Sequence, residues 1–274
     1  MTTSIRLFRG AFGHVSALNV ASNFVTHAHP EAHIIIWLDG AAGEMTIGDE
    51  TLRLGPDVGA CINSLQPHSH ALSDDGTPGR FLAFYIDPEW ARRRRGLAAG
   101  VPLFRSAALS LDKWLYRAAV GVYEGLEEGE ADEIANYEIE RLIDSLIDAA
   151  DAVRPAKGRN SDVVCMRDFR VRKAIELMKL NMCERISFDD VARSVGLSRP
   201  HFFALFKEQT NLTPNVYWNT LRMEEAVRQL QSQDSLISVA CNLGFTTPGN
   251  FSRFFRDHAG VPPTLYREAA RATA

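Results

Sequence analysis

The sequence contains one motif twice, and this repeat limits the folds open to the chain more than any other feature. Residues 191–214 read VARSVGLSRPHFFALFKEQTNLTP, and residues 239–263 read VACNLGFTTPGNFSRFFRDHAGVPP. Small and apolar positions of the first copy recur 48 residues later in its first half and 49 residues later in its second half. Matching order over about 27 positions indicates a duplicated supersecondary unit.

Each copy has the pattern of two short helices joined by a glycine turn. In the first copy, Ser187 can cap a helix whose apolar residues fall at i, i+3, i+4 and i+7 on one face. Gly196 supplies the positive φ that ends this helix, and Ser198 can cap the next one. The second helix then buries an apolar stripe of Phe202, Leu205 and Phe206. This pattern is typical of a helix-turn-helix, which presents its second helix to the major groove of DNA.

The residues after each copy predict a rigid connection between the two units. Asn211 and Gly260 follow the second helices, and these residue types tolerate the left-handed conformation that ends a helix. Thr213 and Pro214 then begin a helix that runs to about Gln231 and would be roughly 28 Å long. That length could hold two reading helices near one DNA turn, about 34 Å, apart. Two hairpins could also build an all-α interaction domain, but the ordered pair favours DNA binding.

The outward faces of the reading helices give the candidate DNA contacts. In the second copy, three phenylalanines take the core, and the predicted contacts are Thr247, Asn250, Ser252, Arg253 and Arg256. Arginine can pair with guanine and asparagine with adenine. In the first copy, the outward residues are Arg199, Pro200, Phe203, Ala204 and Lys207. We expect the two cations there to contact phosphates, and Phe203 either to touch a thymine methyl or to fold back onto the core. The first copy therefore predicts weaker base specificity.

Residues 186–267 resemble the AraC/XylS family of bacterial transcription regulators. The stretches that carry the resemblance are ISFDDVARSVGLSRPHFFALFKEQTNLTPNVY, the LRMEEA of the connector, and ISVACNLGFTTPGNFSRFFRDHAGVPPTLYR. The resemblance implies paired units that bind adjacent major grooves of promoter or operator DNA, and a separate domain that senses a small-molecule effector or dimerises. It further implies a homodimer, contact with RNA polymerase, and activation more often than repression.

The N-terminal part has a β pattern followed by a helical one. Between Ile5 and Ile86 the sequence is strand-like, with a hairpin in EMTIGDETLRL and frequent glycine and proline. Residues 109–153 have helical periodicity, which predicts two helices. We therefore expect an α+β protein with a cupin-like β-barrel and appended helices at 1–155, a linker at 156–165, and an all-α double helix-turn-helix domain at 166–274.

The two parts also differ in charge. Residues 1–160 have 15 basic and 22 acidic side chains, a net charge of −7, whereas residues 161–274 have 15 basic and 12 acidic side chains, a net charge of +3. The excess of positive charge is small, but its sign fits an anionic partner for the C-terminal part.

The N-terminal part also contains two groups of histidines. THAHPEAH places His27, His29 and His33 at even offsets, so on one regular strand they would share a face. Pro30 lies inside this run and indicates an edge or bulge, after which the parity can shift. QPHSH places His68 and His70 on a second strand. The order resembles a cupin metal pattern, except that His33 stands where that pattern has a carboxylate.

The sequence is compatible with three interpretations of these histidines. They could line an organic-effector pocket made of His27, His29, His33, His68 and Trp37. They could hold a divalent metal such as zinc, nickel, iron or manganese through His27, His29, His33 and His68. They could also be structural only. A metal-dependent, dioxygenase-like cupin enzyme fused to a helical interaction domain is the alternative function, and the predicted DNA-binding half argues against it.

The remaining features predict a cytoplasmic protein. The N-terminus lacks an apolar signal core, and the run IIIWL is too short to cross a bilayer. The four cysteines form no CxxC pair, which favours reduced thiols. We expect the arginine run 92–95 to be a solvated charged face rather than a DNA contact. The apolar stripes of the 109–153 helices cover the barrel or form a dimer interface.

Overall fold

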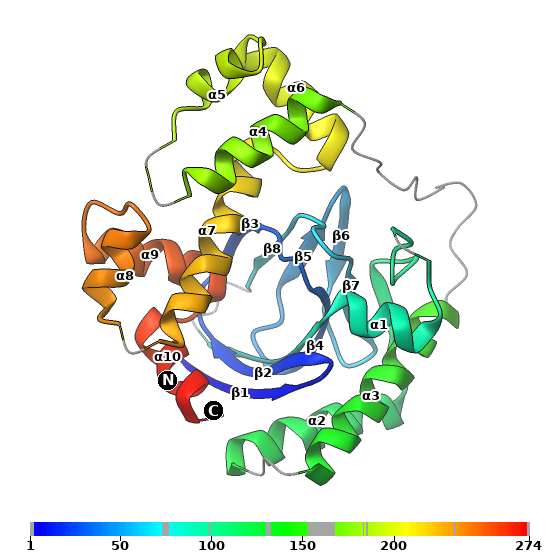
Figure 1. Cartoon of the computed structure of the whole chain (residues 1–274). Coiled ribbons are helices and arrows are strands. Elements are labelled where there is room, and N and C mark those ends of the chain that lie inside the picture. The colour runs from blue at the N-terminus through cyan, green and yellow to red at the C-terminus, as the bar shows by residue number, and fades with distance from the viewer. Residues whose placement is uncertain are drawn as a thin grey trace.

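The computed structural model describes residues 3–72, 77–98, 100–129, 133–152, 168–182, 184, 186–232 and 234–272. It has the expected α+β class, with an antiparallel β domain first and a helical domain after it (Figure 1). The strands are β1 (Ser4–Gly10), β2 (Gly13–Val20), β3 (Phe24–His27), β4 (Ala32–Gly40), β5 (Glu44–Ile47), β6 (Glu50–Arg53), β7 (Val58–Ile62), β8 (His68–Ala71), β9 (Gly79–Ile86) and β10 (Ala108–Ser110). The predicted linker lies outside the described residues, as do Cys165 and Cys183.

Two sheets form the N-terminal domain. One has the strand order β1-β2-β9-β4-β7-β10 and the other has the order β3-β8-β5-β6, and all their pairings are antiparallel. The predicted hairpin is confirmed: β5 pairs with β6 from Glu44↔Arg53 to Ile47↔Glu50, and Gly48 in the turn has a φ of 60°. Apolar side chains from both sheets, including Leu18, Met45 and Phe81, belong to one buried cluster. The sheets therefore close around a common interior.

Three helices accompany the barrel: α1 (Pro88–Arg95), α2 (Lys113–Glu128) and α3 (Glu133–Ala152). The stripe Ile139, Leu142, Ile143, Leu146 and Ile147 of α3 is buried with Leu115 and Ala119 of α2 against the outer face of the six-stranded sheet. The two expected helices are confirmed, although residues 108–110 form a strand rather than the first helical turn. The sequence did not predict α1. Its four consecutive arginines obscure the apolar pattern, although Trp90 and Ala91 are buried.

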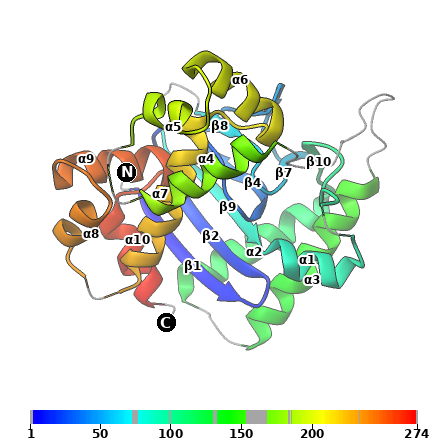
Figure 2. The ribbon, with the colours of Figure 1, turned by 45° about the horizontal axis from the view of Figure 1, so that its top comes forward.

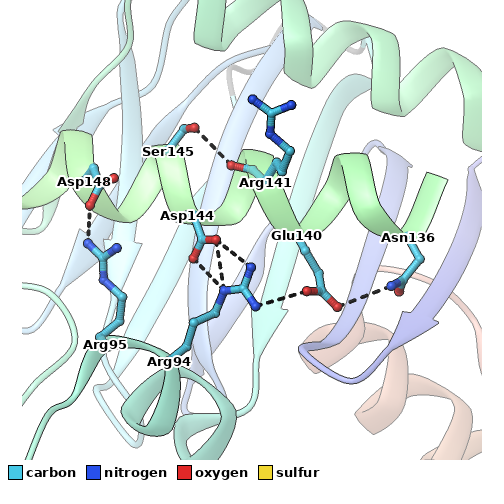
Figure 3. A network of polar contacts seen from close by, with 8 residues as sticks. All are labelled: Arg94, Arg95, Asn136, Glu140, Arg141, Asp144, Ser145 and Asp148. Carbon is cyan, nitrogen blue, oxygen red and sulfur yellow. Dashed lines mark hydrogen bonds and ion pairs between the residues drawn. The ribbon is translucent and has the colours of Figure 1, made fainter. Parts of the chain in front are cut away.

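The arginine run belongs to a network of ion pairs on the protein's own surface. Arg94 donates to both oxygens of Asp144 at 2.9 and 2.9 Å and lies 3.2 Å from Glu140, while Arg95 pairs with Asp148 (Figure 3). These carboxylates belong to α3, so the run fastens α1 to α3. Such half-exposed pairs are each worth about 0–1 kcal/mol, and their number fixes the position of α1 more than it stabilises the fold.

The C-terminal domain consists of helices only, over the residues that are described. They are α4 (Phe169–Leu180), α5 (Phe188–Ser194), α6 (Arg199–Thr210), α7 (Pro214–Leu230), α8 (Leu236–Asn242), α9 (Pro248–Ala259) and α10 (Pro263–Ala272). Helices α5 and α6 form the first unit and α8 and α9 the second, and α7 connects them as a single rod (Figure 1). Gly196 and Gly244 have φ of 71° and 70°, and Asn211 and Gly260 have φ of 59° and 72°. The glycine turns and left-handed helix ends are therefore confirmed in both copies.

The helix starts agree with the sequence except in one hydrogen bond. The Ser187 and Thr213 hydroxyls accept from the backbone N–H groups of Asp190 and Val216 at 3.4 and 3.3 Å. Ser198 lies at the predicted cap of α6, but its side chain makes no capping hydrogen bond, so that part of the expectation is wrong. Proline in the first turn of α6 lacks an N–H and supplies the fixed φ that a helix start needs, which offsets the missing cap.

The two units differ in what they pack against. The first unit and α4 have a separate core, which includes Val171, Val191, Phe202 and Phe206. The second unit and the end of α7 share one core with the barrel interior. Helix α9 contacts β3, and α10 contacts β1, as Figure 2 shows for α10 beside the first two strands. The second unit and α10 therefore pack on strands of both sheets, whereas the first unit has a core of its own at the far end of α7.

A glycine lies at the contact between the end of α9 and β3. A Cβ atom added to Gly260, which ends α9, would lie 2.2 Å from Cζ and 2.5 Å from Cε1 of the Phe24 ring on β3. Close by, α7 is bonded to the segment that follows β3. The Thr220 hydroxyl donates to the backbone oxygen of Ala28 at 3.1 Å, and this bond is buried. Only a residue without a side chain fits between α9 and β3 in this arrangement.

We predict that Gly260→Ala destabilises the chain more than Gly196→Ala does. Both glycines have a left-handed φ, so either substitution should cost about 1–2 kcal/mol of backbone strain. At position 260 the new methyl group also meets the Phe24 ring, which adds about 1–3 kcal/mol of overpacking. Chemical unfolding followed by circular dichroism measures both losses.

Gly196→Ala is the matched control because no atom lies within 4 Å of its added Cβ. In a Phe24→Ala background, the excess loss at position 260 should disappear. Equal losses for the two glycines in the wild-type background would show that the contact with β3 does not constrain α9.

Candidate DNA interface and histidine chamber

The second reading helix, α9, presents the predicted polar residues on its outer face. Thr247 caps the helix by accepting from the Asn250 N–H at 3.2 Å. Thr247, Asn250, Arg253 and Arg256 are exposed and Ser252 is half-buried. Arg256 also lies 3.6 Å from the Asp257 carboxylate, so this cation is partly neutralised before any DNA binds. The helix therefore offers Asn250 and Arg253 as its hydrogen-bond donors for base edges.

The inner face of α9 is held by aromatic side chains. Phe251 and Phe255 are fully buried, as the sequence predicted. Phe254 is half-buried and packs with Phe245 at 5.1 Å between ring centroids. The guanidinium of Arg222 on α7 lies over both rings, at 3.9 Å from Phe245 and 5.2 Å from Phe254. Its Nη2 donates to the backbone oxygen at position 243 at 2.8 Å. Arg222 thus connects the rod to the turn of the second unit.

The first reading helix, α6, has a less polar outer face. Arg199, Pro200 and Ala204 are exposed, and Arg199 pairs with Asp189 at 3.0 Å. Phe203 is half-buried, with its ring edge-on to Phe188 at 5.7 Å and the Arg199 guanidinium 5.4 Å above it. Of the two alternatives for Phe203, the structure has the one in which the ring folds back onto the core. Arg199 shields this ring from solvent.

Lys207 lies beside the barrel rather than in the middle of the reading face. It lines a cleft of about 190 Å³ together with Asn211 and Val216 from the α6–α7 region and Thr46, His68 and Ser69 from the barrel. The side chain is exposed, so it remains available to an anion. Its predicted contact with a DNA phosphate requires the duplex to reach the edge of this cleft.

Four imidazoles meet at one end of the barrel, and we call this group the histidine chamber: His27, His29, His33 and His68. The ring centroids of His27 and His68 are 4.3 Å apart, those of His29 and His33 are 4.6 Å apart, and those of His27 and His29 are 4.8 Å apart. His33 and His68 lie 5.4 Å apart across the group. The geometry thus brings together the four residues that the sequence singled out.

The residues reach the chamber by a route that the sequence did not predict. His27 ends β3 in the four-stranded sheet, His29 lies in the following turn, and His33 belongs to β4 in the six-stranded sheet. They do not share one face of one strand, because the chain crosses between the sheets at Pro30. The parity expectation for a single strand is wrong, but the crossing brings the rings together all the same.

Trp37 does not belong to the chamber. It lies on β4, where it pairs with Phe81, whereas His33 pairs with Tyr85. Four residues along a strand separate them by about 13 Å. The Trp37 indole donates to the backbone oxygen of Gly40 at 3.3 Å, at the opposite end of the strand. The sequence grouped Trp37 with the histidines, but the register of β4 places it at the other end of that strand.

Backbone carbonyls fix the tautomer of three chamber histidines. The Nδ1 atoms of His27, His33 and His68 lie 2.6, 3.0 and 2.9 Å from the backbone oxygens of Val25, Glu31 and Gln66. A carbonyl oxygen can only accept, so each Nδ1 carries the proton and donates it. In the neutral ring, Nε2 then bears the lone pair. The Nε2 of His33 is buried and has no hydrogen-bond partner among the described residues.

These histidines are held in the neutral form. Burial lowers the pKa of His27 and His33 well below the usual value, and the neighbouring His68 lowers both further. Burial lowers the pKa of His29 in the same way, with His33 and His27 as the next causes. Burial also lowers the pKa of His68 to about 4. At neutral pH the chamber therefore contains uncharged imidazoles with lone pairs, rather than a cluster of cations.

The structure adds three residues to the surroundings of the chamber. Tyr85 of β9 packs on His33 at 4.3 Å, and His14 of β2 stacks on Tyr85 at 4.2 Å. The third residue, His258, comes from α9 of the helical domain, and its ring lies 6.1 Å from that of His27. Sequence reasoning missed His258 because only the packing of α9 on β3 brings it near, and its spacing within α9 gives no sign of that contact.

Comparisons with known proteins agree with this architecture. Residues 17–149 match the family model of the AraC-like ligand binding domain, and residues 191–269 match that of a helix-turn-helix domain. The crystal structure of a variant of apo ToxT from Vibrio cholerae has the same overall fold, with a TM-score of 0.54 and 11% identity over 96% of this chain and 99% of that chain. Fold and family models together define a DNA-binding transcription regulator with an N-terminal ligand-binding domain.

The chain belongs to the AraC family of transcription regulators. The protein named "Probable transcriptional regulator LumQ" from Photobacterium leiognathi is 24% identical over 92% of this chain and 95% of its own length. The regulator ArgR of Pseudomonas aeruginosa is 31% identical over 37% of this chain and 31% of its length. The lactose operon transcription activator of Staphylococcus xylosus is 31% identical over 35% of each chain. The chain thus spans about a third of the length of the last two relatives. These relatives favour the regulator over the enzyme alternative.

We predict that Arg253→Ala lowers affinity for a specific site by about 1–3 kcal/mol and relaxes the preference at one base pair. Lys207→Ala should instead weaken binding to all sequences alike, because a phosphate contact carries no sequence information. Binding to operator and to random duplexes, compared by fluorescence anisotropy at one salt concentration, separates the two effects. Arg93→Ala, which removes an exposed cation from α1, is the charge-matched control. Equal losses on operator and random DNA for Arg253→Ala would remove this residue from base reading.

Proposed function

We propose that the protein is an effector-responsive transcription regulator that inserts α6 and α9 into successive major grooves of one operator half. The observation that carries the proposal is the duplicated unit, with one reading helix exposed at each end of the continuous rod α7. Helix α9 supplies most of the base recognition through Asn250 and Arg253. Helix α6, whose Phe203 is folded back, contributes phosphate contacts and shape rather than base-edge hydrogen bonds.

We further propose that the effector binds in the N-terminal domain at the histidine chamber. The chamber lies where β3 packs against the second reading unit, so a change in its rings is transmitted directly to α9. Because α9 packs on β3 and α10 packs on α9, a shift of β3 costs packing energy unless the second unit moves with it. Effector binding would then alter how the two reading helices are presented, and activation follows through contact with RNA polymerase.

The helices that cover the barrel provide a surface for a homodimer. An apolar groove of about 380 Å³ lies between α2 and α3 and is lined by residues such as Ala118, Val122 and Leu126. Large apolar side chains stand exposed around it: Trp114, Ile134 and Tyr137 have 58%, 68% and 62% of their surface exposed. We propose that a second copy of the chain covers this face, since a regulator that reads two half-sites gains affinity from dimerisation.

Mapping of bound sites across the genome, followed by footprinting, tests the proposed function. We expect the full-length protein to protect two adjacent major-groove turns per half-site, and the double variant Asn250→Ala, Arg253→Ala to lose this pattern. A protein that folds normally and protects no sequence over background at moderate salt would contradict the proposal. The genes beside the bound sites would also identify the regulated pathway.

The dimer surface gives a separate prediction. Replacing Trp114 by Glu should raise the dimer dissociation constant at least about tenfold, because it puts a charge into an apolar interface. Analytical ultracentrifugation over a concentration series measures this change. The control is Ile237→Glu on α8, where an apolar side chain is 69% exposed away from the α2–α3 groove. If both variants dimerise like the wild type, or if the wild type is a monomer at all concentrations, the α2–α3 face is not the interface.

Of the described residues, none forms a helix with both the length and the apolar character needed to cross a bilayer. The expectation of a cytoplasmic location remains part of the proposal, because a regulator of this kind must reach the chromosome.

A further inference from the structure

We propose that the histidine chamber is a site for a divalent transition-metal ion, with His27, His29 and His68 as ligands. We also propose that His258 of α9 couples this site to the second reading unit. The inference deepens the proposed function by naming the chemical class of the effector. It rests on that function only for the coupling step, since metal binding can be measured without DNA.

The positions of the donor atoms support an ion. One ring nitrogen from each of His27, His29 and His68 lies within 4.8 Å of the others. Two imidazoles bound to one zinc ion at about 2.0–2.1 Å each have nitrogens about 3.4 Å apart in a tetrahedral site. A bound ion would therefore draw the three ring nitrogens closer together than they lie here. His33 lies outside this group of three, but its ring stacks on His29 at 4.6 Å between centroids, and its buried Nε2 has no partner among the described residues.

The second hydrogen bonds of these rings have the arrangement found behind metal ligands. A metal-binding histidine commonly donates its other ring N–H to a carbonyl or carboxylate, which fixes the ring and its tautomer. The Nδ1 atoms of His27, His33 and His68 all donate to backbone oxygens two residues earlier in the chain. Two of the three proposed ligands, His27 and His68, and the neighbouring His33 are therefore already oriented with Nε2 free for coordination.

The chamber rings lie too close together to enclose a large organic molecule between them. The chamber rings stand 4.3–5.5 Å from one another, and Tyr85 closes one side at 4.3 Å from His33. His29 is half-buried in its turn and gives access from solvent. The donors are neutral nitrogens, which suit zinc, nickel, copper or iron, whereas magnesium and calcium prefer oxygen ligands.

His258 connects the site to the DNA-binding domain. Its Nδ1 lies 2.7 Å from the backbone oxygen of Phe254 within α9, so this nitrogen donates and Nε2 bears the lone pair. That Nε2 is buried without a partner among the described residues, and the ring stands 6.1 Å from His27. An ion held by His27 would therefore place positive charge near the His258 Nε2 atom of α9. This contact lies two residues before Gly260, where α9 ends against β3.

The test uses full-length protein freed of metal by a chelator. Zinc, nickel and cobalt salts are added in turn, and calorimetry gives stoichiometry and affinity, while the visible absorption of bound cobalt reports nitrogen coordination. We expect one ion per chain, and an affinity lowered at least about 10–100-fold in each of His27→Ala, His29→Ala and His68→Ala. The matched control is His70→Ala, on the same strand as His68, because His70 is also buried but its Nε2 bonds to the backbone oxygen of Ala42.

Circular dichroism of the metal-free variants keeps the result interpretable. If His27→Ala or His68→Ala unfolds, His29→Gln decides the matter, since this residue lies in a turn and should leave the strands intact. Absence of stoichiometric binding for all three ions, or binding that His29→Gln leaves unchanged, would overturn the site. So would enrichment of an organic compound on the purified chain that competes for the chamber in place of the ions.

The coupling has its own readout. In the wild type, the preferred ion should change operator affinity by about fivefold or more. In His258→Ala the ion should still bind while this change is lost. An unchanged response in His258→Ala would overturn the coupling through α9. A chain that binds DNA but no ion would refute this inference alone, and a chain that binds the ion but no DNA would refute the proposed function and keep the metal site.

Discussion

The packing of the second reading unit onto the barrel is the constraint on which the rest of the structure depends. Met223 and Phe255 from the helical domain are buried in the same cluster as Leu7 and Met45 from the two sheets. Removing such side chains from water is worth about 1.5–3 kcal/mol each, so a shared core is a far stronger connection than a surface contact. It places α9 against β3 and thereby brings the proposed reading helix next to the histidines.

This connection makes the two copies of the motif unequal. The second copy buries part of its apolar surface against the N-terminal domain, and its outer face exposes Asn250 and Arg253. The first copy packs with α4 in its own core and meets the barrel beside Lys207, at a cleft rather than through a common core. Its outer face is also less suited to base recognition, since Phe203 is turned inward. In the proposed mechanism, one unit thus receives the signal and reads bases, and the other adds affinity.

Much of the helical domain could be predicted from sequence because its determinants are local. Gly196, Asn211 and Thr213 act on the backbone within one turn, and the phenylalanine stripes repeat with helical spacing. The same holds for the hairpin at Gly48. The failures have two causes. The sequence did not predict α1, because the charge of its arginines masked its two buried residues. It also could not show that Trp37 lies at the opposite end of β4 from His33, because the pattern did not give the bounds of that strand.

The sequence predicted which four histidines form the chamber, but not which strands and sheets bring them together. Even spacing suggested that His27, His29 and His33 share one strand, whereas they meet because the chain passes from one sheet to the other at Pro30. Periodicity describes one element at a time, so it cannot show which sheet an element joins. For the same reason no pattern indicated His258, whose place near His27 follows from the domain contact and not from any local spacing.

The single helix α7 also has a geometric consequence for evolution. An α-helix turns by about 100° and rises about 1.5 Å with every residue. Insertion or deletion of one residue between Pro214 and Leu230 would therefore rotate one unit about the axis of α7 by about 100° relative to the other unit. The distance between the two units would change by only about 1.5 Å. Operators for this protein should tolerate substitution of single base pairs far more readily than a change in the number of base pairs between the two grooves. A continuous helix has no hinge through which the two units could adjust to a new spacing.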